Sequence, residues 1–280
     1  MNKGISRWSI PAEIPLEQAM RQAKDAGFEG LELSFDAVGD LDFTTTQSQA
    51  EAVRALADKV GIGIAGLATG YHWEHPLTSS DPQKRTAGIS AVDKMLDIAK
   101  WIGVDAILVV PGAVDVFFLP DAEVVPYDVA YKRSKDAIGG LVKKAEANKV
   151  AIGLENVWNK FLLSPLEFRD FIDSFGSDYV GSWFDAGNVL STGYPEHWIP
   201  ILGKRIKRVH VKDFKSAIGN ANGFCDLGEG DVNWPAVMDA LKAINYDGWV
   251  TAEMIPTYTL FPAGTVYAAS MGLDYILERR

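Results

Sequence analysis

The feature that most constrains the fold of this chain is a regular alternation of short apolar runs with longer amphipathic runs. The short runs are rich in β-branched residues and are bounded by Gly, Pro, Asn or Asp, which is typical of strands. We expect strands at Ile5–Ile10, Gly30–Phe35, Gly61–Ala68, Ala106–Pro111, Val150–Asn156, Val180–Ala186, Ile206–Lys212 and Trp249–Met254. Successive runs begin about 35 residues apart, which is the length of one strand–helix unit in a parallel sheet. The pattern therefore predicts an α/β protein.

The segments between these strands carry apolar residues at helical spacing. We expect helices at Leu16–Ala26, Gln49–Val60, Ala87–Ile102, Asp128–Asn148, Pro165–Phe175, Trp198–Leu202, Trp234–Ile244 and Val266–Leu277. Ser164 before Pro165 and Asn233 before Trp234 are typical helix starts. Eight consecutive strand–helix units favour a closed (β/α)8 TIM barrel over an open sheet of eight parallel strands. Because residues 1–280 contain no Pro/Ser-rich linker, we expect a single domain.

Charge and composition exclude several classes of function. The 280 residues carry a formal net charge of −10, which disfavours a nucleic-acid partner because its phosphate backbone is also negative. No apolar run approaches the roughly 20 residues of a membrane span, and the first residues lack the apolar core of a signal peptide. The single cysteine, Cys225, permits no intramolecular disulfide, which suits a reducing compartment. We therefore expect a cytoplasmic protein that acts on small molecules.

Four successive predicted strands end in residues that can bind a metal, namely Glu155, Asp185, His210 and Glu253. In a parallel barrel these strand ends meet at one face. Each residue alone has an ordinary explanation, because a strand-end carboxylate often caps the next helix and a lone histidine is often a core residue. Together, the three carboxylates would repel one another unless a cation neutralised them. We therefore predict one divalent metal ion, with Mn²⁺ favoured by oxygen-rich ligands and one imidazole, and Mg²⁺, Co²⁺ or Zn²⁺ as alternatives.

Several motifs around these four residues resemble one superfamily of barrels. They are Glu155-Asn156, Asp185-Ala-Gly-Asn188, His210-Val-Lys-Asp213, Leu227-Gly-Glu-Gly-Asp231 followed by Trp234-Pro235, and Thr251-Ala-Glu253. As a set they are similar to the xylose isomerase-like TIM-barrel superfamily, which includes sugar isomerases, ketose 3-epimerases, sugar-phosphate isomerases and epimerases, and endonuclease IV. The resemblance covers nearly the whole chain and is strongest from Val150 to Met254.

The resemblance implies a metal-dependent isomerase or epimerase that acts on a sugar or sugar phosphate through a metal-bound enediolate. It further implies that Glu155 and Glu253 are acid/base catalysts as well as metal ligands, one removing a proton and the other returning one. The cation would polarise the substrate carbonyl as a Lewis acid. Two alternatives from other reaction classes stay open. An inosose-type dehydratase shares the enediolate chemistry, and an endonuclease IV-like DNA hydrolase needs more histidines than the four in this chain.

The sequence departs at three points from the pattern of the free-ketose 3-epimerases that it resembles. Asn188 stands where those enzymes usually have His, and Phe161 stands where they have a second Glu. Lys212 and Lys215 occupy the stretch where an Arg is expected. These differences favour the sugar-phosphate branch. We predict a phosphate site formed by the two lysines and by Pro262–Thr265 at the start of the last helix, because a helix N-terminus can hold an anion.

Four residues near the predicted strand ends are candidates for substrate binding: Trp8, His72, Asn188 and Lys212. The indole could pack against a sugar ring, and the three polar side chains could bond to hydroxyl groups. We expect the loop around residues 117–119 to serve as a lid or as a subunit contact, since loops of this length are often functional. The sequence leaves open whether the chain forms a homo-oligomer.

Overall fold

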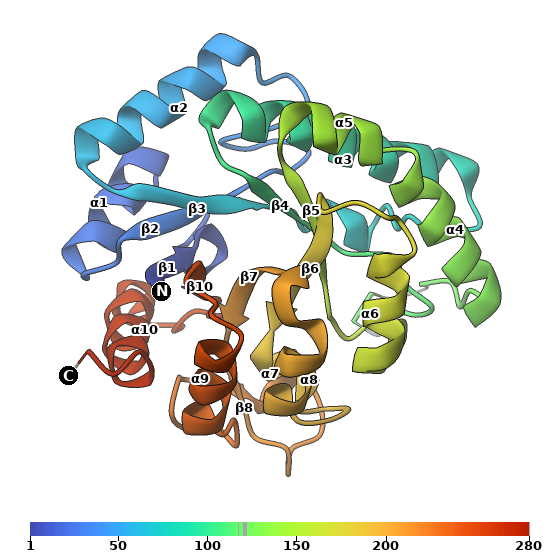
Figure 1. The fold of residues 1–280 in the computed structure, drawn as a ribbon. Helices are drawn as coiled ribbons and strands as arrows, with labels where there is room; N and C mark the ends of the chain where they lie inside the picture. Colours follow the sequence, from blue (N-terminus) through green and yellow to red (C-terminus); the bar gives the residue numbers. More distant parts are fainter. Residues whose placement is uncertain (117, 120–121, 280) are drawn as a thin grey trace.

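A closed barrel of parallel strands forms the centre of the computed structural model, which describes residues 1–116, 118–119 and 122–279 (Figure 1). Within these residues, eight strands are joined in the order β1-β10-β7-β6-β5-β4-β3-β2. They are β1 (Asn2–Ser6), β2 (Gly30–Ser34), β3 (Gly63–Ala68), β4 (Ala106–Val109), β5 (Ala151–Glu155), β6 (Val180–Asp185), β7 (Ile206–Val211) and β10 (Trp249–Ala252). The predicted (β/α)8 TIM barrel is confirmed, and the open-sheet alternative is wrong.

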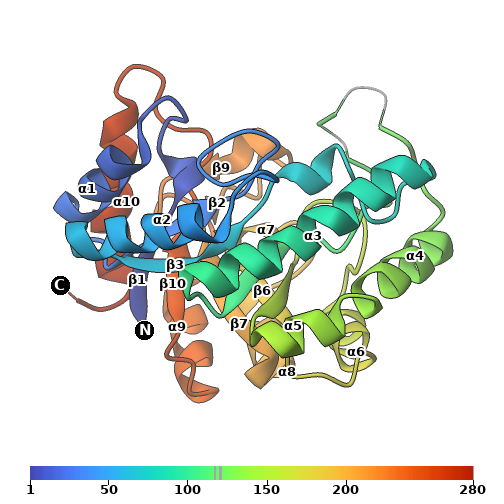
Figure 2. The same ribbon diagram turned by 90° about the horizontal axis from the view of Figure 1, so that it is seen from above.

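The helices form an outer ring around the barrel, which is visible in both ribbon views (Figure 1, Figure 2). They are α1 (Leu16–Asp25), α2 (Gln47–Val60), α3 (Pro82–Ile102), α4 (Tyr127–Gly139), α5 (Val142–Asn148), α6 (Pro165–Asp173), α7 (Ala186–Val189), α8 (Pro195–Leu202), α9 (Trp234–Ala243) and α10 (Pro262–Ile276). After β7, the short strands β8 (Asp213–Phe214) and β9 (Phe224–Cys225) pair antiparallel. Among the described residues, no helix combines the length and apolar character that crossing a bilayer requires.

Helix boundaries follow capping signals in the sequence. At the start of α2, the Thr46 side chain accepts a hydrogen bond from the Gln49 N–H, and the Gln49 side chain bonds back to the Thr46 N–H. Ser164 and Asn233 cap α6 and α9, as predicted. At the other end of α2, Gly61 adopts a left-handed φ of 76°, a conformation that glycine reaches without a Cβ clash.

The first strand lies earlier in the chain than the sequence pattern predicted. It spans Asn2–Ser6 rather than Ile5–Ile10, and the following residues form the 3₁₀ turn η1 (Arg7–Ser9), in which the Trp8 N–H donates a hydrogen bond to the Ser6 side chain. Lys3 is buried in this strand, where its ammonium group lies 2.6 Å from Asp274 on α10. A buried lysine is rare unless it is paired, so its charge hid the start of the strand.

The helices also differ from the prediction at several ends. The predicted helix Asp128–Asn148 is two helices, α4 and α5, separated at Gly140 and Leu141. Adjacent glycines at 139 and 140 weaken a helix because glycine has a low helix propensity. Three helices begin three or more residues earlier than predicted, each with a proline in its first turn where no intrahelical N–H bond is needed. They are α3, α8 and α10, which begin at Pro82, Pro195 and Pro262.

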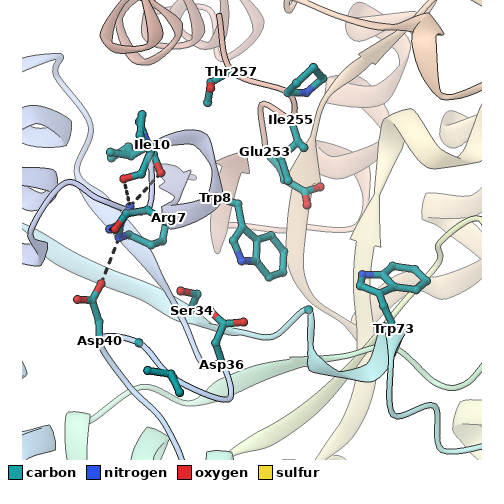
Figure 3. Close-up of a pocket in the computed structure, with 16 residues that line it drawn as sticks. Arg7, Trp8, Ile10, Ser34, Asp36, Asp40, Trp73, Glu253, Ile255 and Thr257 are labelled. Carbon is teal, nitrogen blue, oxygen red and sulfur yellow. Dashed lines mark hydrogen bonds and ion pairs between the residues drawn. The ribbon is translucent and has the colours of Figure 1, made fainter. Parts of the chain in front are cut away.

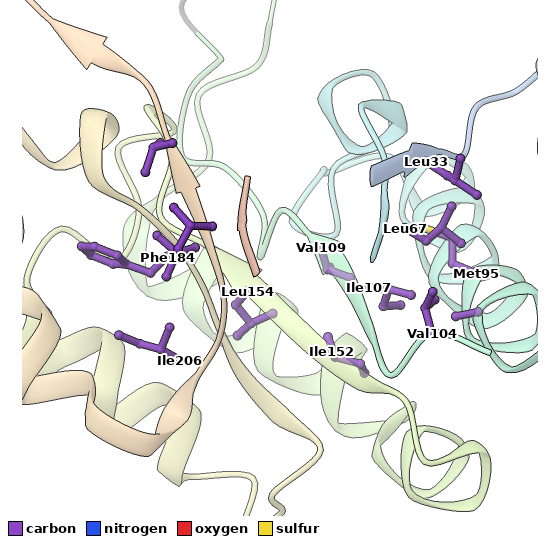
Figure 4. Packing of buried hydrophobic residues seen from close by; sticks show 14 of the residues in the cluster. Leu33, Leu67, Met95, Val104, Ile107, Val109, Ile152, Leu154, Phe184 and Ile206 are labelled. Carbon is purple, nitrogen blue, oxygen red and sulfur yellow. The ribbon is translucent and has the colours of Figure 1, made fainter. Parts of the chain in front are cut away.

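The main hydrophobic core lies between the outward face of the barrel and the ring of helices. Alternate residues of neighbouring strands, such as Ile107 and Val109 on β4 and Ile152 and Leu154 on β5, point toward the helices (Figure 4). All four are fully buried. Truncation of one such side chain to alanine typically costs about 2–5 kcal/mol, so this layer fixes the strand positions on which the site depends.

The interior of the barrel is filled below its carboxyl end by Trp183, which is fully buried. The indole fits because two facing positions are glycines. A Cβ at Gly66 would lie 2.5 Å from Trp183 Cη2, and one at Gly153 would lie 2.9 Å from Trp183 Cε3. Below it, the Arg208 guanidinium lies 5.9 Å from the indole ring and donates a hydrogen bond to the Ala65 carbonyl. The barrel is therefore a packed core rather than a pore.

Candidate metal centre

Four buried side chains converge at the carboxyl end of the barrel. Glu155 and Asp185 are the last residues of β5 and β6. His210 is the second-to-last residue of β7, and Glu253 directly follows β10. Strand pairing places Asp185 directly opposite His210. One potential ligand atom from each of the four residues lies within 4.8 Å of the corresponding atoms of the others. The structure therefore brings together all four residues that the sequence singled out as metal ligands.

Asp185 is held in place by interactions that leave one of its carboxylate oxygens available. Its Oδ1 accepts a hydrogen bond from the Asn188 N–H at 2.8 Å and so caps α7. Its backbone N–H and C=O both bond to the side-chain amide of Asn156, at 2.9 and 2.8 Å. Its Oδ2 is buried and takes no part in these bonds; the Lys212 ammonium lies 3.2 Å from it. Asp185 is thus both a helix cap and a potential ligand, through different oxygens.

Glu32 on β2 is a member of the site that the sequence analysis missed. Its Oε2 lies 2.8 Å from His210 Nε2, and both side chains are fully buried. Because a carboxylate accepts hydrogen bonds, Nε2 carries a proton directed at Glu32, and Nδ1 faces the cluster, where it could bind a metal ion once it has lost its own proton. Nδ1 lies 3.2 Å from Glu155 Oε1 and 3.6 Å from Glu253 Oε2. A carboxylate in the inward-facing row of an otherwise apolar strand was the available signal.

Lys212 provides a second cation beside the carboxylates. Its ammonium group contacts Glu253 Oε2 and lies 3.2 Å from Asp185 Oδ2. It also lies 5.2 Å from the centre of the Phe224 ring. The side chain is largely buried, and its position confirms that residue 212 points inward like residue 210.

Burial and mutual charge shift the pKa values of this cluster. Burial raises the pKa of the Glu155 carboxyl group to about 7, and it also raises the pKa of Asp185. Burial would likewise raise the pKa of Glu253, but the Lys212 ammonium and His210 outweigh it and hold that pKa well below its usual range. For His210, burial would lower the pKa, yet the carboxylates of Glu32, Glu155 and Glu253 raise it well above the usual value. Without a metal ion, the repulsion between these carboxylates is reduced by bound protons and by the Lys212 and His210 cations. A divalent ion could take over that role.

The donor set fits a divalent metal ion. Atoms bonded to one such ion at about 2.1 Å lie no more than about 4.2 Å apart, so the observed spread within 4.8 Å requires only small side-chain adjustments. Asp185 Oδ2 is buried and faces the cluster without a well-aligned hydrogen bond, so a cation could bind it there. Three carboxylates and one imidazole are ligands that suit Mn²⁺, Mg²⁺ or Co²⁺. Glu155, Asp185, His210 and Glu253 could therefore hold one ion at this position.

A cavity of about 290 Å³ opens directly above the cluster. Among its lining residues are Glu155 and Glu253 and three of the four predicted substrate-binding residues, Trp8, Asn188 and Lys212. Phe118 of the predicted lid and Trp158 also line this cavity. The walls that were not predicted are Thr69, Trp73, Val110, Val157, Ala221, Phe224, Ile255 and Pro256. Its volume is near the lower limit of about 300 Å³ for small-molecule sites, so it suits a single sugar unit.

One predicted residue, His72, does not line this cavity, whereas the predicted lid contributes Phe118 to its wall. His72 lies in the 3₁₀ turn η2 (Tyr71–Trp73), where it is buried and its Nε2 lies 3.3 Å from the Gly88 carbonyl. The structure does not bring it to the cavity; its neighbour Trp73 lines the wall instead. In the predicted lid, residue 117 lies outside the described residues, whereas Phe118 packs edge-on against Trp73 with ring centres 5.0 Å apart.

The residues predicted to bind phosphate do not form one site, because Lys215 and Pro262–Thr265 do not line the cavity above the cluster. Lys215 is exposed and lies 3.2 Å from Glu229. Helix α10 begins at Pro262, which has no backbone N–H, and the N–H of Gly264 bonds to the Phe261 carbonyl. Of the predicted phosphate ligands, Lys212 is the one that reaches the cavity.

Comparisons with known proteins agree with this architecture. The model of the family described as xylose isomerase-like TIM barrel matches residues 20–274. The L-ribulose-5-phosphate 3-epimerase UlaE of Escherichia coli O1:K1 is 24% identical over 95% of this chain and 91% of its own length. The D-psicose 3-epimerase of Clostridium cellulolyticum H10, solved with D-tagatose, superposes with a TM-score of 0.81 at 18% identity, covering 99% of each chain. A solved L-ribulose 3-epimerase superposes with a TM-score of 0.78 at 19% identity, covering 99% of this chain and 96% of its own.

Proposed function

Because this chain belongs to the xylose isomerase-like TIM barrel family, we propose that it is a divalent-metal-dependent isomerase that epimerises a ketose. The observation that carries the proposal is the buried cluster of Glu155, Asp185, His210 and Glu253, which opens into a cavity the size of one sugar unit. The names of its relatives support epimerisation in particular, since they include 3-epimerases of ketoses and of ketose phosphates.

The four cluster residues would hold the ion, for which we favour Mn²⁺. A divalent cation bound there supplies a Lewis acid that polarises a substrate carbonyl and offsets negative charge on the neighbouring oxygens. Lys212 lines the same cavity, so its ammonium group is placed to donate a hydrogen bond to a substrate oxygen. The Trp8 indole forms an apolar wall, and Asn188 forms a polar one.

Glu155 and Glu253 are the residues that we assign to proton transfer. They come from strands β5 and β10, which are separated in the barrel by β6 and β7, so their carboxylates approach the cavity from different sides. One carboxylate removes the proton from the carbon next to the carbonyl, which gives an enediolate, and the other returns a proton to the opposite face. Delivery to the opposite face inverts that carbon and produces the epimer. Return of the proton to the neighbouring carbon would instead exchange an aldose with a ketose.

The proposal is tested by proton exchange in D₂O. The protein is stripped with a chelator, reloaded with Mn²⁺, and incubated with a panel of free ketoses and ketose phosphates while NMR follows deuterium incorporation. We expect deuterium at one carbon next to the carbonyl, a new signal from the epimer, and loss of both in the metal-free sample.

The same experiment separates the proposal from its alternatives. An inosose-type dehydratase would form a product that has lost water, without an epimer. Full activity in a sample verified to be free of metal would contradict the metal-dependent proposal. If no sugar in the panel exchanged a proton with the reloaded protein, the assignment to ketose epimerisation would be wrong.

A further inference from the structure

A second and larger pocket lies beside the cavity above the four-residue cluster (Figure 3). Its volume is about 690 Å³, and it extends from the cluster across the carboxyl ends of β1, β2 and β3. The two spaces are adjoining, because they share five lining residues: Trp8, Trp73, Glu253, Ile255 and Pro256. A sugar whose reacting end lies at the cluster can therefore extend into this larger pocket, which we name the distal pocket.

The walls of the distal pocket combine aromatic surface with hydrogen-bond acceptors. Figure 3 shows Trp8 projecting between Glu253 and Asp36, with Trp73 on the other side of the pocket from Asp40. Indole faces pack well against the apolar faces of a sugar ring. Ionised carboxylates only accept hydrogen bonds, so the two aspartates suit hydroxyl groups, which can donate.

The basic residue of the distal pocket is already fully used. Arg7 is the single Lys, Arg or His among the described residues that line it, and its guanidinium has five N–H donors. Its Nε bonds to Asp40 Oδ2 at 3.3 Å, while Nη1 and Nη2 donate two hydrogen bonds each to backbone carbonyls. The carbonyls are those of Ile10, Pro11, Ala12 and Ile14. Arg7 thus fixes the loop after β1 and keeps no donor for a ligand.

From these walls we infer that the distal pocket binds an uncharged, hydroxyl-rich extension of the substrate, such as a glycosyl unit, and rejects a phosphate at that end. The inference rests on the proposed function, since it describes the far end of the same ketose. A phosphate there would face Asp36 and Asp40 without a free cation, and like charges in a partly buried pocket repel strongly. A hydroxyl-bearing ring meets neither cost. The volume beyond the first cavity exceeds what one monosaccharide needs.

This inference runs against the phosphate site that the sequence suggested. The predicted phosphate ligands lie toward the β7 and β10 side of the mouth, where Asp226 and Glu229 line a further pocket together with Lys212. Lys215 there is paired with Glu229. The cations near that side are therefore matched by acids, as Arg7 is in the distal pocket.

The test compares three forms of one sugar with the Mn²⁺-loaded wild-type protein. The ketose that exchanges fastest in D₂O is assayed beside its terminally phosphorylated form and its terminally glucosylated form; for D-fructose these are fructose 6-phosphate and isomaltulose. We expect the glucosylated sugar to keep at least half the kcat/KM of the free ketose, and the phosphorylated sugar to lose at least tenfold. A phosphorylated sugar that equals or exceeds the free ketose, or a glucosylated sugar below half, overturns the inference.

A charge reversal tests the assignment to this pocket. Asp36→Lys should raise the kcat/KM of the phosphorylated sugar relative to the free ketose by at least tenfold, because one charge-assisted hydrogen bond is worth at least that factor. Asp239→Lys on the exposed face of α9 changes the net charge equally and should leave the ratio unchanged. An equal rise in both variants would assign the effect to net charge and contradict the inference. Exchange of any ketose would leave the proposed function standing in each of these cases.

Discussion

The two halves of the barrel mouth differ in the chemistry that their strands present. The half formed by β5, β6, β7 and β10 ends in three carboxylates and an imidazole, all buried. The half formed by β1 to β4 leads instead into a wall with Trp8 and Trp73 and the polar residues of the distal pocket. Buried charges must be compensated, so the first half tolerates few changes. The second half shapes a pocket, and its side chains can vary with the substrate at lower cost.

Glu32 is the point at which the two halves are coupled. It belongs to β2, but its carboxylate bonds across the barrel interior to His210 on β7. The half that carries the distal pocket therefore supplies a support for the half that carries the four-residue cluster. Four predictions test how far this division holds.

Removal of a metal ligand should have the largest effect. Asp185→Asn and His210→Ala each take one donor from the cluster, and we expect metal affinity to fall by more than about 100-fold, beyond the range seen for outer-sphere changes. Activity should fall to background at micromolar Mn²⁺. Metal content after gel filtration and calorimetric titration would measure the loss. Asp40→Asn takes a carboxylate from the other half, and unchanged metal content in that variant is the matched control.

Glu253→Gln should separate metal binding from chemistry. The amide keeps one coordinating oxygen but cannot accept the substrate proton, so exchange in D₂O should fall by about 10²–10⁴-fold. The variant should still retain most of its metal. Glu229→Gln changes a nearby exposed acid that pairs with Lys215 and should exchange normally. Near wild-type exchange in Glu253→Gln would assign the proton transfer to another residue.

Glu32→Gln should weaken metal binding although Glu32 touches no metal in our proposal. Loss of a carboxylate that orients a ligating imidazole typically costs about 10–100-fold in metal affinity. We expect a decrease in that range, with kcat at saturating Mn²⁺ changed less than the metal affinity. Unfolding of the variant measured in chelator would separate a loss of fold from a loss of affinity. Unaltered affinity would reduce Glu32 to a packing role.

His72 should affect stability rather than catalysis. Burial lowers the pKa of His72 to about 4, against an ordinary value of 6.5. Between these two values the unfolded chain binds a proton that the folded chain does not, so stability is present above pH 6.5 and is lost as the pH falls toward 4. The loss is on the order of 3 kcal/mol. Urea unfolding of wild type and His72→Gln at pH 7 and pH 5 should show a smaller loss of unfolding free energy at pH 5 in the variant. An equal loss in the two proteins would contradict the assignment.

Periodicity predicted the architecture because each strand–helix unit has its own pattern of apolar residues, a short run for the strand and helical spacing for the helix. The four-residue cluster could also be predicted, since Glu155, Asp185, His210 and Glu253 occupy equivalent places on consecutive strand–helix units. Their convergence follows from topology alone, without knowledge of side-chain contacts.

The remaining features depended on contacts between distant parts of the chain. Glu32 is a carboxylate in a largely apolar strand, but its partner could not be predicted, because only the closed barrel places it against His210, 178 residues away. Lys3 obscured the first strand because its partner Asp274 lies at the other end of the chain. The distal pocket was equally hidden, since the donors of Arg7 are consumed by carbonyls that sequence cannot assign.

Trp183 closes the inner end of the candidate site. Because the indole and Arg208 close the barrel beneath the cluster, water and ligands reach it from the mouth. A bound sugar that fills the mouth then blocks the access of solvent to the cluster. We expect the proton taken by one glutamate to be sheltered from bulk solvent while the sugar is bound, so that reversal of the first step returns part of an isotopic label to the substrate. A sugar that also fills the distal pocket should exchange its label with solvent more slowly than a shorter sugar does.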